Sequence, residues 1–329
     1  MKVPAQCSPL VSVFSVAQKV AVVGAGAVGG YYGARLARAG AEVSFLLRRD
    51  LAAVKAHGLR IKQPPADDIT LQPARAFGST AEIGPVDLVI IGIKATGNDQ
   101  LLHLLPPLLA ERTALLLLQN GLGGDEFLAR HFGAQRVLGG LCFVCLNRTA
   151  PGEITCTLPG YLALGEFAGP PTDRLRDLAD RFAAGGVKTV LAGNLAEARW
   201  QKLIWNVPFN GLAIAAGGVT TDVIMRDASF RAEAHALMDE IVIAAARLGY
   251  AVPPGFIRMQ LDHTAAMGPY RPSSLIDWQE GRAVEVEAIW GEPLRRARAA
   301  GAAMPHLEQL YARLKSLTAG RRGHLSTNS

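Results

Sequence analysis

Lys202, Asn206 and Asn210 recur every four residues in a segment otherwise rich in Trp, Leu, Ile, Val and Phe. Each step of four advances about 40° around a helix, so the three side chains are expected on one face. Asn forms helices poorly, so two of them on one face indicate another use. An ammonium group beside amides can protonate a carbonyl oxygen as it gains negative charge. The alternative is a polar groove that only hydrogen-bonds to neighbouring helices.

A second pattern able to do chemistry is the run Gly24-Ala25-Gly26-Ala27-Val28-Gly29. It directly follows a β-rich stretch, 19–23, and opens a helical stretch, 28–39, which the spacing predicts to end at Gly40. Gly24 allows a tight turn, Gly26 lets the backbone approach a pyrophosphate, and Gly29 lets helix and strand pack closely. The helix N-terminus supplies free N–H groups to phosphates. The pattern predicts dinucleotide binding; the alternative is an ordinary glycine-rich turn.

The end of the next predicted strand, 42–47, indicates which dinucleotide binds. It is followed by Arg48, Arg49 and Asp50. Arginine suits the 2′-phosphate of NADP, whereas an acidic residue suits the ribose hydroxyls of NAD. Asp50 precedes a short predicted helix, 51–57, and is expected to be its N-cap. We therefore predict NADPH/NADP as the cofactor, with Arg48 at the 2′-phosphate.

Further strands are predicted at 87–93 and 114–118, each an apolar run that ends in polar residues. Lys94 follows the first and Asn120 follows the second. Ligands of open α/β sheets bind beyond the carboxyl ends of the strands, so both residues are placed to touch a ligand.

The remaining pattern divides the chain. Short strands are predicted over 138–165, with turns at Pro151-Gly152 and Pro159-Gly160, followed by a helix at 175–184 and a strand at 187–191. Beyond Gly193 the pattern is helical, with a capping box at Asn194 and Glu197 and a helix that Pro208 should disturb. Later helices are predicted at 230–248, 256–264, 274–280, 284–300 and 305–317. The predicted fold is α/β: an N-terminal extension (1–18), an NADP-binding Rossmann-type domain with a doubly wound parallel sheet (19–192), and an all-helical substrate and catalytic domain (193–329).

Composition excludes other classes. The 34 basic and 28 acidic residues leave a net charge of +6 without aromatic residues among the basic clusters, so no nucleic acid partner is predicted. No apolar run reaches the roughly 18–20 residues of a membrane span, and residues 1–18 do not match a signal peptide. Cys142 and Cys145 should point to opposite faces of a strand, so they are expected to be structural and reduced, with no metal site. Reduced cysteines predict a cytoplasmic protein.

Together these motifs resemble the ketopantoate reductase (2-dehydropantoate 2-reductase) family over residues 19–317. The resemblance rests on separate segments: the 24–29 glycine motif, the strand ending in Arg48, Gly92-Ile93-Lys94, Gln119-Asn120-Gly121-Leu122-Gly123, the Lys202/Asn206/Asn210 spacing, and Ser273-Ser274-Leu275-Ile276-Asp277 followed by Gly281-Arg282 and Glu285.

The resemblance implies a role for each matching residue. Lys202 would be the general acid of an NADPH-dependent reduction of ketopantoate, and Glu285 would pair with or orient it and contact the cofactor. Asn206 and Asn210 would hold the substrate hydroxyl and carbonyl, and Ser273 the substrate carboxylate. Asn120 and Lys94 would line the nicotinamide side.

Some positions depart from the family pattern and leave the substrate open. Gly217-Gly218-Val219-Thr220-Thr221 stands where the family often has Asn or a similar polar residue, with Thr220 as the equivalent, and Trp290-Gly291 replaces Asn-Gly. Arg271 could add a contact to a carboxylate or phosphate. The alternatives are a reductase of another small 2-keto acid, or an NADP-sensing protein without catalysis. Leu- and Ala-rich helices in the second domain could form a homodimer interface.

Overall fold

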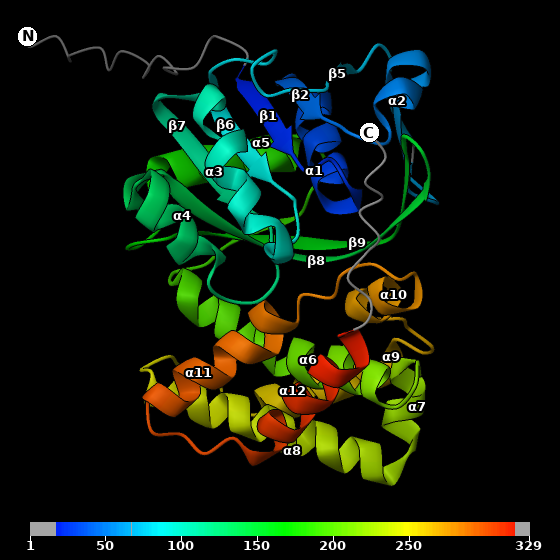
Figure 1. The fold of residues 1–329 in the computed structure, drawn as a ribbon, viewed down its shortest axis with the longest axis vertical. Coiled ribbons are helices and arrows are strands. Elements are labelled where there is room, and N and C mark those ends of the chain that lie inside the picture. The colour runs from blue at the N-terminus through cyan, green and yellow to red at the C-terminus, as the bar shows by residue number, and fades with distance from the viewer. Residues whose placement is uncertain (1–17, 67, 320–329) are drawn as a thin grey trace, which may run out of the picture.

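The computed structural model describes residues 18–66 and 68–319, and all but the last residue of the predicted N-terminal extension lies outside these ranges. The described chain has two parts (Figure 1): an α/β part built on a sheet and, below it in this view, a part made of helices. No helix within these ranges is both long and apolar enough to cross a membrane.

The sheet is mostly parallel, as predicted. Its order is β4-β3-β9-β8-β7-β6-β1-β2-β5, with β10 also paired to β9. The antiparallel pairs are β8 with β9 and β3 with β4. The strands are β1 (Lys19–Val23), β2 (Glu42–Leu46), β3 (Leu59–Lys62), β4 (Ile69–Leu71), β5 (Arg75–Phe77), β6 (Val86–Ile91), β7 (Leu109–Leu117), β8 (Val137–Ala150), β9 (Glu153–Glu166) and β10 (Thr189–Leu191).

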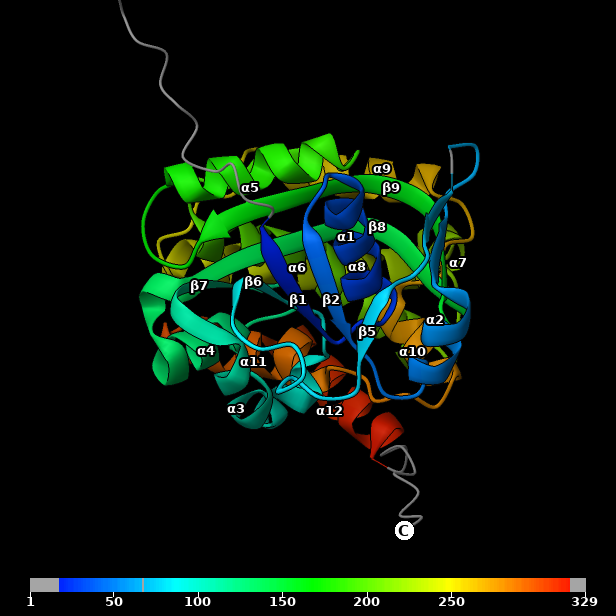
Figure 2. The same ribbon diagram turned by 90° about the horizontal axis from the view of Figure 1, so that it is seen from above.

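Helices cover both faces of this sheet, because alternate residues of the central strands point to opposite sides. Val20 and Val22 pack in the cluster that contains α1 (Ala27–Arg38) and α5 (Asp173–Ala184). Ala21 and Val23 pack in the cluster that contains α3 (Leu101–Leu104) and α4 (Gly124–Phe132). Figure 2 shows α5 and α3 on opposite sides of the strands. The doubly wound prediction is therefore confirmed.

The prediction of several short strands over 138–165 is wrong. The segment forms two strands of 14 residues each, β8 and β9, paired antiparallel. The predicted turn at Pro151-Gly152 joins them, but Pro159-Gly160 lies inside β9, beside a shift in register after Phe143. Gly160 has a φ of +46°, and a Cβ there would overlap the carbonyl oxygen of Phe143. Glycine and proline mark a β-bulge as readily as a turn, which is why the sequence misled.

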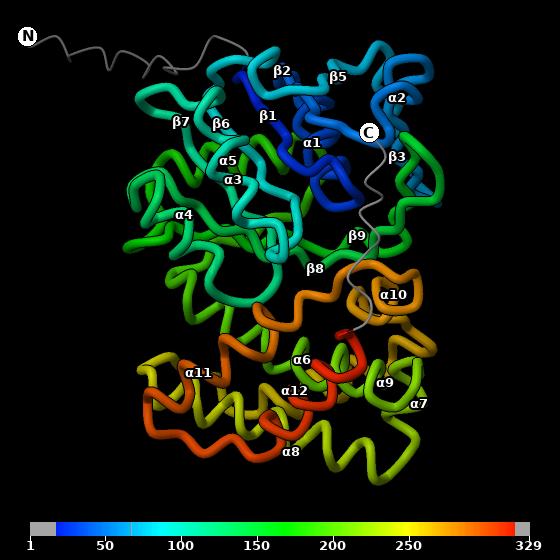
Figure 3. Tube along the Cα trace, viewed as in Figure 1, coloured from blue at the N-terminus to red at the C-terminus, as the bar shows by residue number. Residues whose placement is uncertain are grey.

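The second part is helical, as predicted, and α6 contacts α8, α10 and α12 (Figure 3). Its α-helices are α6 (Leu195–Ala215), α7 (Thr221–Arg226), α8 (Ala228–Arg247), α9 (Phe256–Ala266), α10 (Ser273–Gln279), α11 (Glu292–Ala299) and α12 (Pro305–Thr318). The sequence did not indicate α7. The helix predicted over 284–300 comprises a π-helical turn, Glu287–Gly291, and then α11.

Helix α6 differs from its prediction at its N-cap and at Pro208. The Asn194 side chain accepts a hydrogen bond from the Glu197 backbone N–H, so the predicted cap forms. The Glu197 carboxylate accepts from the Ala251 N–H at 2.9 Å, so the cap is not a reciprocal capping box. Pro208 does not end the helix, which continues through it for another two turns. Strong burial of this segment outweighs the lost backbone bond.

Candidate active site

The glycine turn between β1 and α1 has the geometry that dinucleotide binding requires. Gly24 has a φ of +91°, and a Cβ there would overlap the backbone N of Ile93. A Cβ on Gly29 would overlap the carbonyl oxygen of Gly24, so this glycine permits the helix to approach the turn. Nothing lies within 4 Å of the Cβ position of Gly26. Ala25, Ala27 and Val28 complete the half-buried turn, and no side chain caps α1. A pyrophosphate fits this open, uncapped helix N-terminus.

The end of β2 presents positive charge. Arg48 and Arg49 are exposed, and the side chain of neither forms a hydrogen bond or ion pair with other residues that the structure describes. Asp50 precedes α2 (Leu51–His57), but its side chain does not cap that helix as expected. Its buried carboxylate instead accepts hydrogen bonds from Arg148, at 3.2 Å, and from the Gly152 N–H, at 3.3 Å. This engagement removes Asp50 as a competing ribose ligand and leaves two arginines that fit a 2′-phosphate.

Lys202 lies where α6 meets the carboxyl end of the sheet. Its amine donates to Asn120 Oδ1 at 2.9 Å and to the carbonyl oxygen of Cys142 at 2.8 Å. Burial lowers the pKa of Lys202 to about 8; Cys142 and Glu285 oppose this shift and Arg199 adds to it. A lysine with this pKa is mostly charged at neutral pH yet releases its proton readily, as a general acid must.

A narrow pocket surrounds this amine. It is lined by Gln119, Asn120, Gly121, Leu141, Arg199, Lys202, Leu203 and Asn206. The structure thus brings together three residues predicted from separate motifs: Asn120 from the loop after β7, and Lys202 and Asn206 from α6. Asn206 is nearly buried beside the amine, which places a neutral polar group where a substrate hydroxyl or carbonyl can be bound.

Asn210, the third of the polar residues predicted on one face of α6, hydrogen-bonds to the protein backbone. Its Oδ1 accepts from the Ser274 N–H at 3.0 Å, and its Nδ2 donates to the Asn206 carbonyl oxygen at 3.2 Å. Both ends of the amide are therefore bound by the protein, and the side chain anchors the first turn of α10. Ser273, the residue predicted for the substrate carboxylate, begins α10 and is exposed. The amide keeps a second N–H and a second lone pair, so the predicted substrate contact by Asn210 stays a prediction.

Glu285 and Lys94 hold the two parts of the chain together. The buried Glu285 carboxylate accepts from the Ala95 N–H at 2.8 Å, and burial raises its pKa. Lys94 binds the Asp277 carboxylate at 2.6 Å and donates to the Ala283 carbonyl oxygen at 3.0 Å. Glu285 acts on Lys202 through its charge; the expected direct pairing between them is not among the ion pairs of the described residues.

A buried ion pair that the sequence did not reveal supports the pocket. Arg199 donates to Asp125 Oδ1 at 2.8 Å and to the Gln119 carbonyl oxygen at 3.1 Å, which ties α6 to α4 and to the end of β7. Burial raises the pKa of Asp125 and the Arg199 charge opposes that shift. The available signal was a charged residue three positions before Lys202, and nothing in the sequence pairs it with Asp125.

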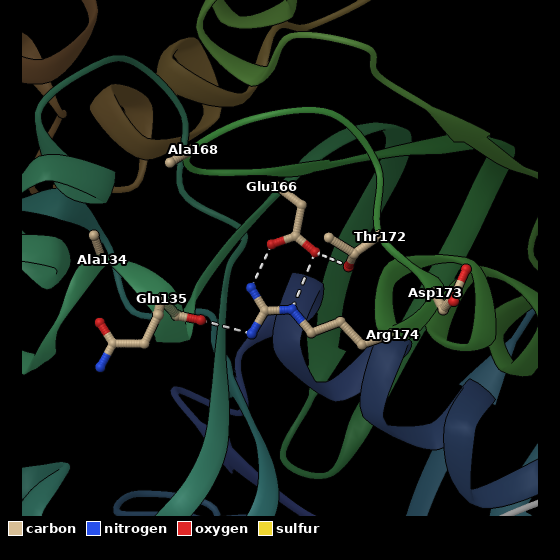
Figure 4. A pocket seen from close by; sticks show the side chains of 7 residues that line it. All are labelled: Ala134, Gln135, Glu166, Ala168, Thr172, Asp173 and Arg174. Atoms are coloured by element: carbon tan, nitrogen blue, oxygen red, sulfur yellow. Dashed lines mark hydrogen bonds and ion pairs between the residues drawn. The ribbon is translucent and has the colours of Figure 1, made fainter.

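Another hollow shares no residue with the Lys202 pocket (Figure 4). It is lined by Ala134, Gln135, Glu166, Ala168, Thr172, Asp173 and Arg174. Glu166 binds Arg174 and Thr172, and Arg174 also donates to the Gln135 carbonyl oxygen at 2.6 Å. These bonds tie β9, α5 and the turn before β8 together, so the cluster serves the fold.

Comparisons with known proteins identify the family of the chain. The family model described as "Ketopantoate reductase PanE/ApbA" matches residues 20–169, and the model described as "Ketopantoate reductase PanE/ApbA C terminal" matches residues 194–318. A 2-dehydropantoate 2-reductase of Nostoc sp. is 38% identical over 318 residues, covering 95% of this chain and 99% of the relative. The crystal structure of 2-dehydropantoate 2-reductase from Geobacter metallireducens has a TM-score of 0.88 and 41% identity, over 91% of this chain and 99% of that one. The corresponding structure from Methylococcus capsulatus has a TM-score of 0.86 and 35% identity, over 94% and 100%.

Proposed function

The chain belongs to the ketopantoate reductase PanE/ApbA family, and we propose that it reduces 2-dehydropantoate (ketopantoate) to pantoate with NADPH. The observation that carries this proposal is the Lys202 amine, half-enclosed at the carboxyl end of the sheet and held by Asn120 and the Cys142 carbonyl oxygen. Pantoate production serves pantothenate and coenzyme A biosynthesis.

Lys202 is the general acid in this proposal. Its ammonium has three N–H donors, of which Asn120 and Cys142 take two, so one remains for the substrate carbonyl oxygen. The positive charge stabilises the negative charge that develops on that oxygen, and the ammonium then gives it a proton. NADPH, when bound, supplies the hydride to the carbonyl carbon. The neutral amine regains a proton afterwards, and the Glu285 charge favours that return.

The other residues bind and orient. Asn206 is proposed to hold the substrate hydroxyl from beside Lys202, and Ser273 the carboxylate from the start of α10. The Gly26 turn and the α1 N-terminus would hold the pyrophosphate, Arg48 and Arg49 the 2′-phosphate. Lys94, Asn120 and Glu285 would lie on the nicotinamide side, since they meet at the carboxyl ends of β6 and β7.

We further propose a cytoplasmic protein, because Cys142, Cys145 and Cys156 are free thiols that suit a reducing compartment. A homodimer formed by the helical part stays a prediction.

The test follows NADPH absorbance with purified protein and 2-dehydropantoate, beside a panel of other 2-keto acids and an NADH control. Oxidation of NADPH that is fastest with 2-dehydropantoate is the expected result. Turnover of another keto acid alone would reassign the protein to that substrate on the same scaffold. Tight NADPH binding without turnover of any keto acid would instead indicate a sensor.

A further inference from the structure

Phe143 on β8 stands directly against the Lys202 amine. The Nζ atom of Lys202 lies over the Phe143 ring, 5.0 Å from its centre. An ammonium within about 6 Å of a ring centre is attracted by the negative face of the aromatic ring. The neighbouring residue, Cys142, supplies the carbonyl oxygen that accepts from the same amine. Two consecutive residues of one strand therefore contact Lys202, one through its backbone and one through its ring.

The fold holds this ring in place. Phe143 pairs with Tyr161 across β8 and β9, and their rings stack with centres 4.3 Å apart and planes 12° from parallel. Both rings pack beside Leu195 and Ala198, on the turn of α6 that precedes Lys202. The register shift after Phe143, made possible by Gly160, belongs to the same stretch. A stacked, packed ring cannot turn away from the amine without disturbing its neighbours.

Burial is the largest influence on the protonation of this amine, and it works against the charged form. Burial and the like charge of Arg199, on α6, disfavour it. Glu285, from the segment before α11, favours it, and so does Cys142 on β8. Glu285, however, makes its hydrogen bond to Ala95 and none to Lys202. The ring is thus a half-buried contact partner of the ammonium that needs no charge of its own.

We propose that Phe143 is a positioning residue for Lys202: its ring face holds the ammonium under the pocket and keeps it protonated for donation to the substrate carbonyl. The inference rests on the proposed function for the identity of the reaction, but not for the contact itself. The hydrogen bonds to Asn120 and to the Cys142 carbonyl oxygen leave one N–H of the ammonium for the substrate carbonyl.

The experiment measures the ionisation of Lys202 directly, by NMR titration of side-chain-labelled lysine in the cofactor-free protein. A variant lacking Lys202 identifies the signal. Phe143→Leu removes the ring and keeps an apolar side chain, and the pKa of Lys202 should fall by about 0.5–1 unit. Phe143→Tyr keeps a ring and should restore the wild-type value. Phe143→Met replaces the leucine variant if that variant does not fold.

Leu195→Ala is the packing control, because it disturbs the same cluster and leaves the ring in place. Its Lys202 should titrate as in wild type. An unchanged pKa in Phe143→Leu, or an equal fall in Phe143→Leu and Leu195→Ala, would overturn the proposal. The alkaline limb of the turnover profile should move to lower pH in parallel. A shifted NMR titration in a protein that does not reduce 2-dehydropantoate would support the ring's role and reject the substrate.

Discussion

Burial and nearby charges act in opposite directions on the pKa of Lys202, and the resulting pKa predicts how turnover depends on pH. With a pKa of about 8, its ammonium form dominates at neutral pH and is lost as the pH rises through that value. Because the proposed reaction consumes the ammonium proton, we expect turnover to fall above about pH 8. Steady-state rates at saturating substrate between pH 6 and pH 10, roughly the span of one lysine titration, test this. A flat profile would contradict the assignment.

The same residue predicts a loss of rate on truncation. Lys202→Ala should lower turnover on the order of 10²–10⁴-fold, the usual contribution of one proton-transfer group. Lys188→Ala removes a comparable charge from an exposed position and should keep wild-type turnover. NADPH oxidation by the two purified variants is the measurement. Comparable rates for both would remove Lys202 from the chemistry.

Arg48 predicts the cofactor preference. It is exposed beyond β2 while the neighbouring Asp50 is held by Arg148. Hydrogen bonds to charged groups contribute about 1.5–3 kcal/mol, so Arg48→Ala should raise the KM for NADPH about 10–100-fold. The KM for NADH, which has no 2′-phosphate, should change little. The ratio of the two kcat/KM values is the readout, and an unaltered ratio would count against the assignment.

At the scale of elements, α6 is the piece on which the site depends. Its first half carries Arg199 toward α4 and Lys202 toward the pocket, and its second half carries Asn210 toward α10. One helix thereby fixes Lys202, the proposed proton donor, relative to both the sheet and the helix that begins with Ser273. Its rigidity depends on burial along most of its length.

The buried pair of Arg199 and Asp125, which links α6 to α4, is expected to stabilise the fold. Arg199→Ala leaves the Asp125 carboxylate buried without its counter-charge, which should cost about 3–5 kcal/mol of unfolding free energy. Arg176→Ala breaks an exposed pair with Asp173 and should have no measurable effect. Urea unfolding of both variants compares them. Equal stability would mean that the buried pair adds nothing to the fold.

At the scale of the whole molecule, contacts across the boundary join the α/β and helical parts. Lys202 binds Asn120, Lys94 binds Asp277 at 2.6 Å, and the Leu122 N–H donates to the Ala288 carbonyl oxygen at 2.9 Å. The orange chain that leads into α11 lies against the α/β part in Figure 3, which agrees with these bonds. The site consists of residues from both parts, so its geometry depends on their remaining docked.

This docking predicts cooperative unfolding. All four tryptophans, Trp200, Trp205, Trp278 and Trp290, lie in the helical part, so their fluorescence reports that part alone. Far-UV circular dichroism reports both parts. We expect the two thermal transitions to coincide, as in a two-state process. Separate midpoints would show that the parts unfold independently, and the expectation would then be wrong.

The sequence by itself predicted the doubly wound fold class and the helical second part, but not β3, β4, β5 or α7. The glycine motif, the buried strands and the helical periodicity after Gly193 depend on neighbouring residues, so local pattern predicted the doubly wound sheet and the helical second part. The same spacing put Lys202 and Asn206 on one face, and strand ends pointed to Asn120. One wrong prediction also came from a local pattern. A proline–glycine pair occurs both in turns and in β-bulges, so the sequence predicted a turn at Pro159-Gly160, which lies inside β9.

Only the tertiary structure decided what each polar group binds. Arg199 meets Asp125 across 74 positions, Asp50 meets Arg148 across 98, and Glu285 meets the Ala95 N–H across 190. It also brought the Asn210 amide to the first turn of α10, and set the Phe143 ring against Lys202. Such pairings depend on how separate elements pack, because a hydrogen bond or ring contact needs atoms within a few ångströms, and no local periodicity encodes which distant residue arrives there.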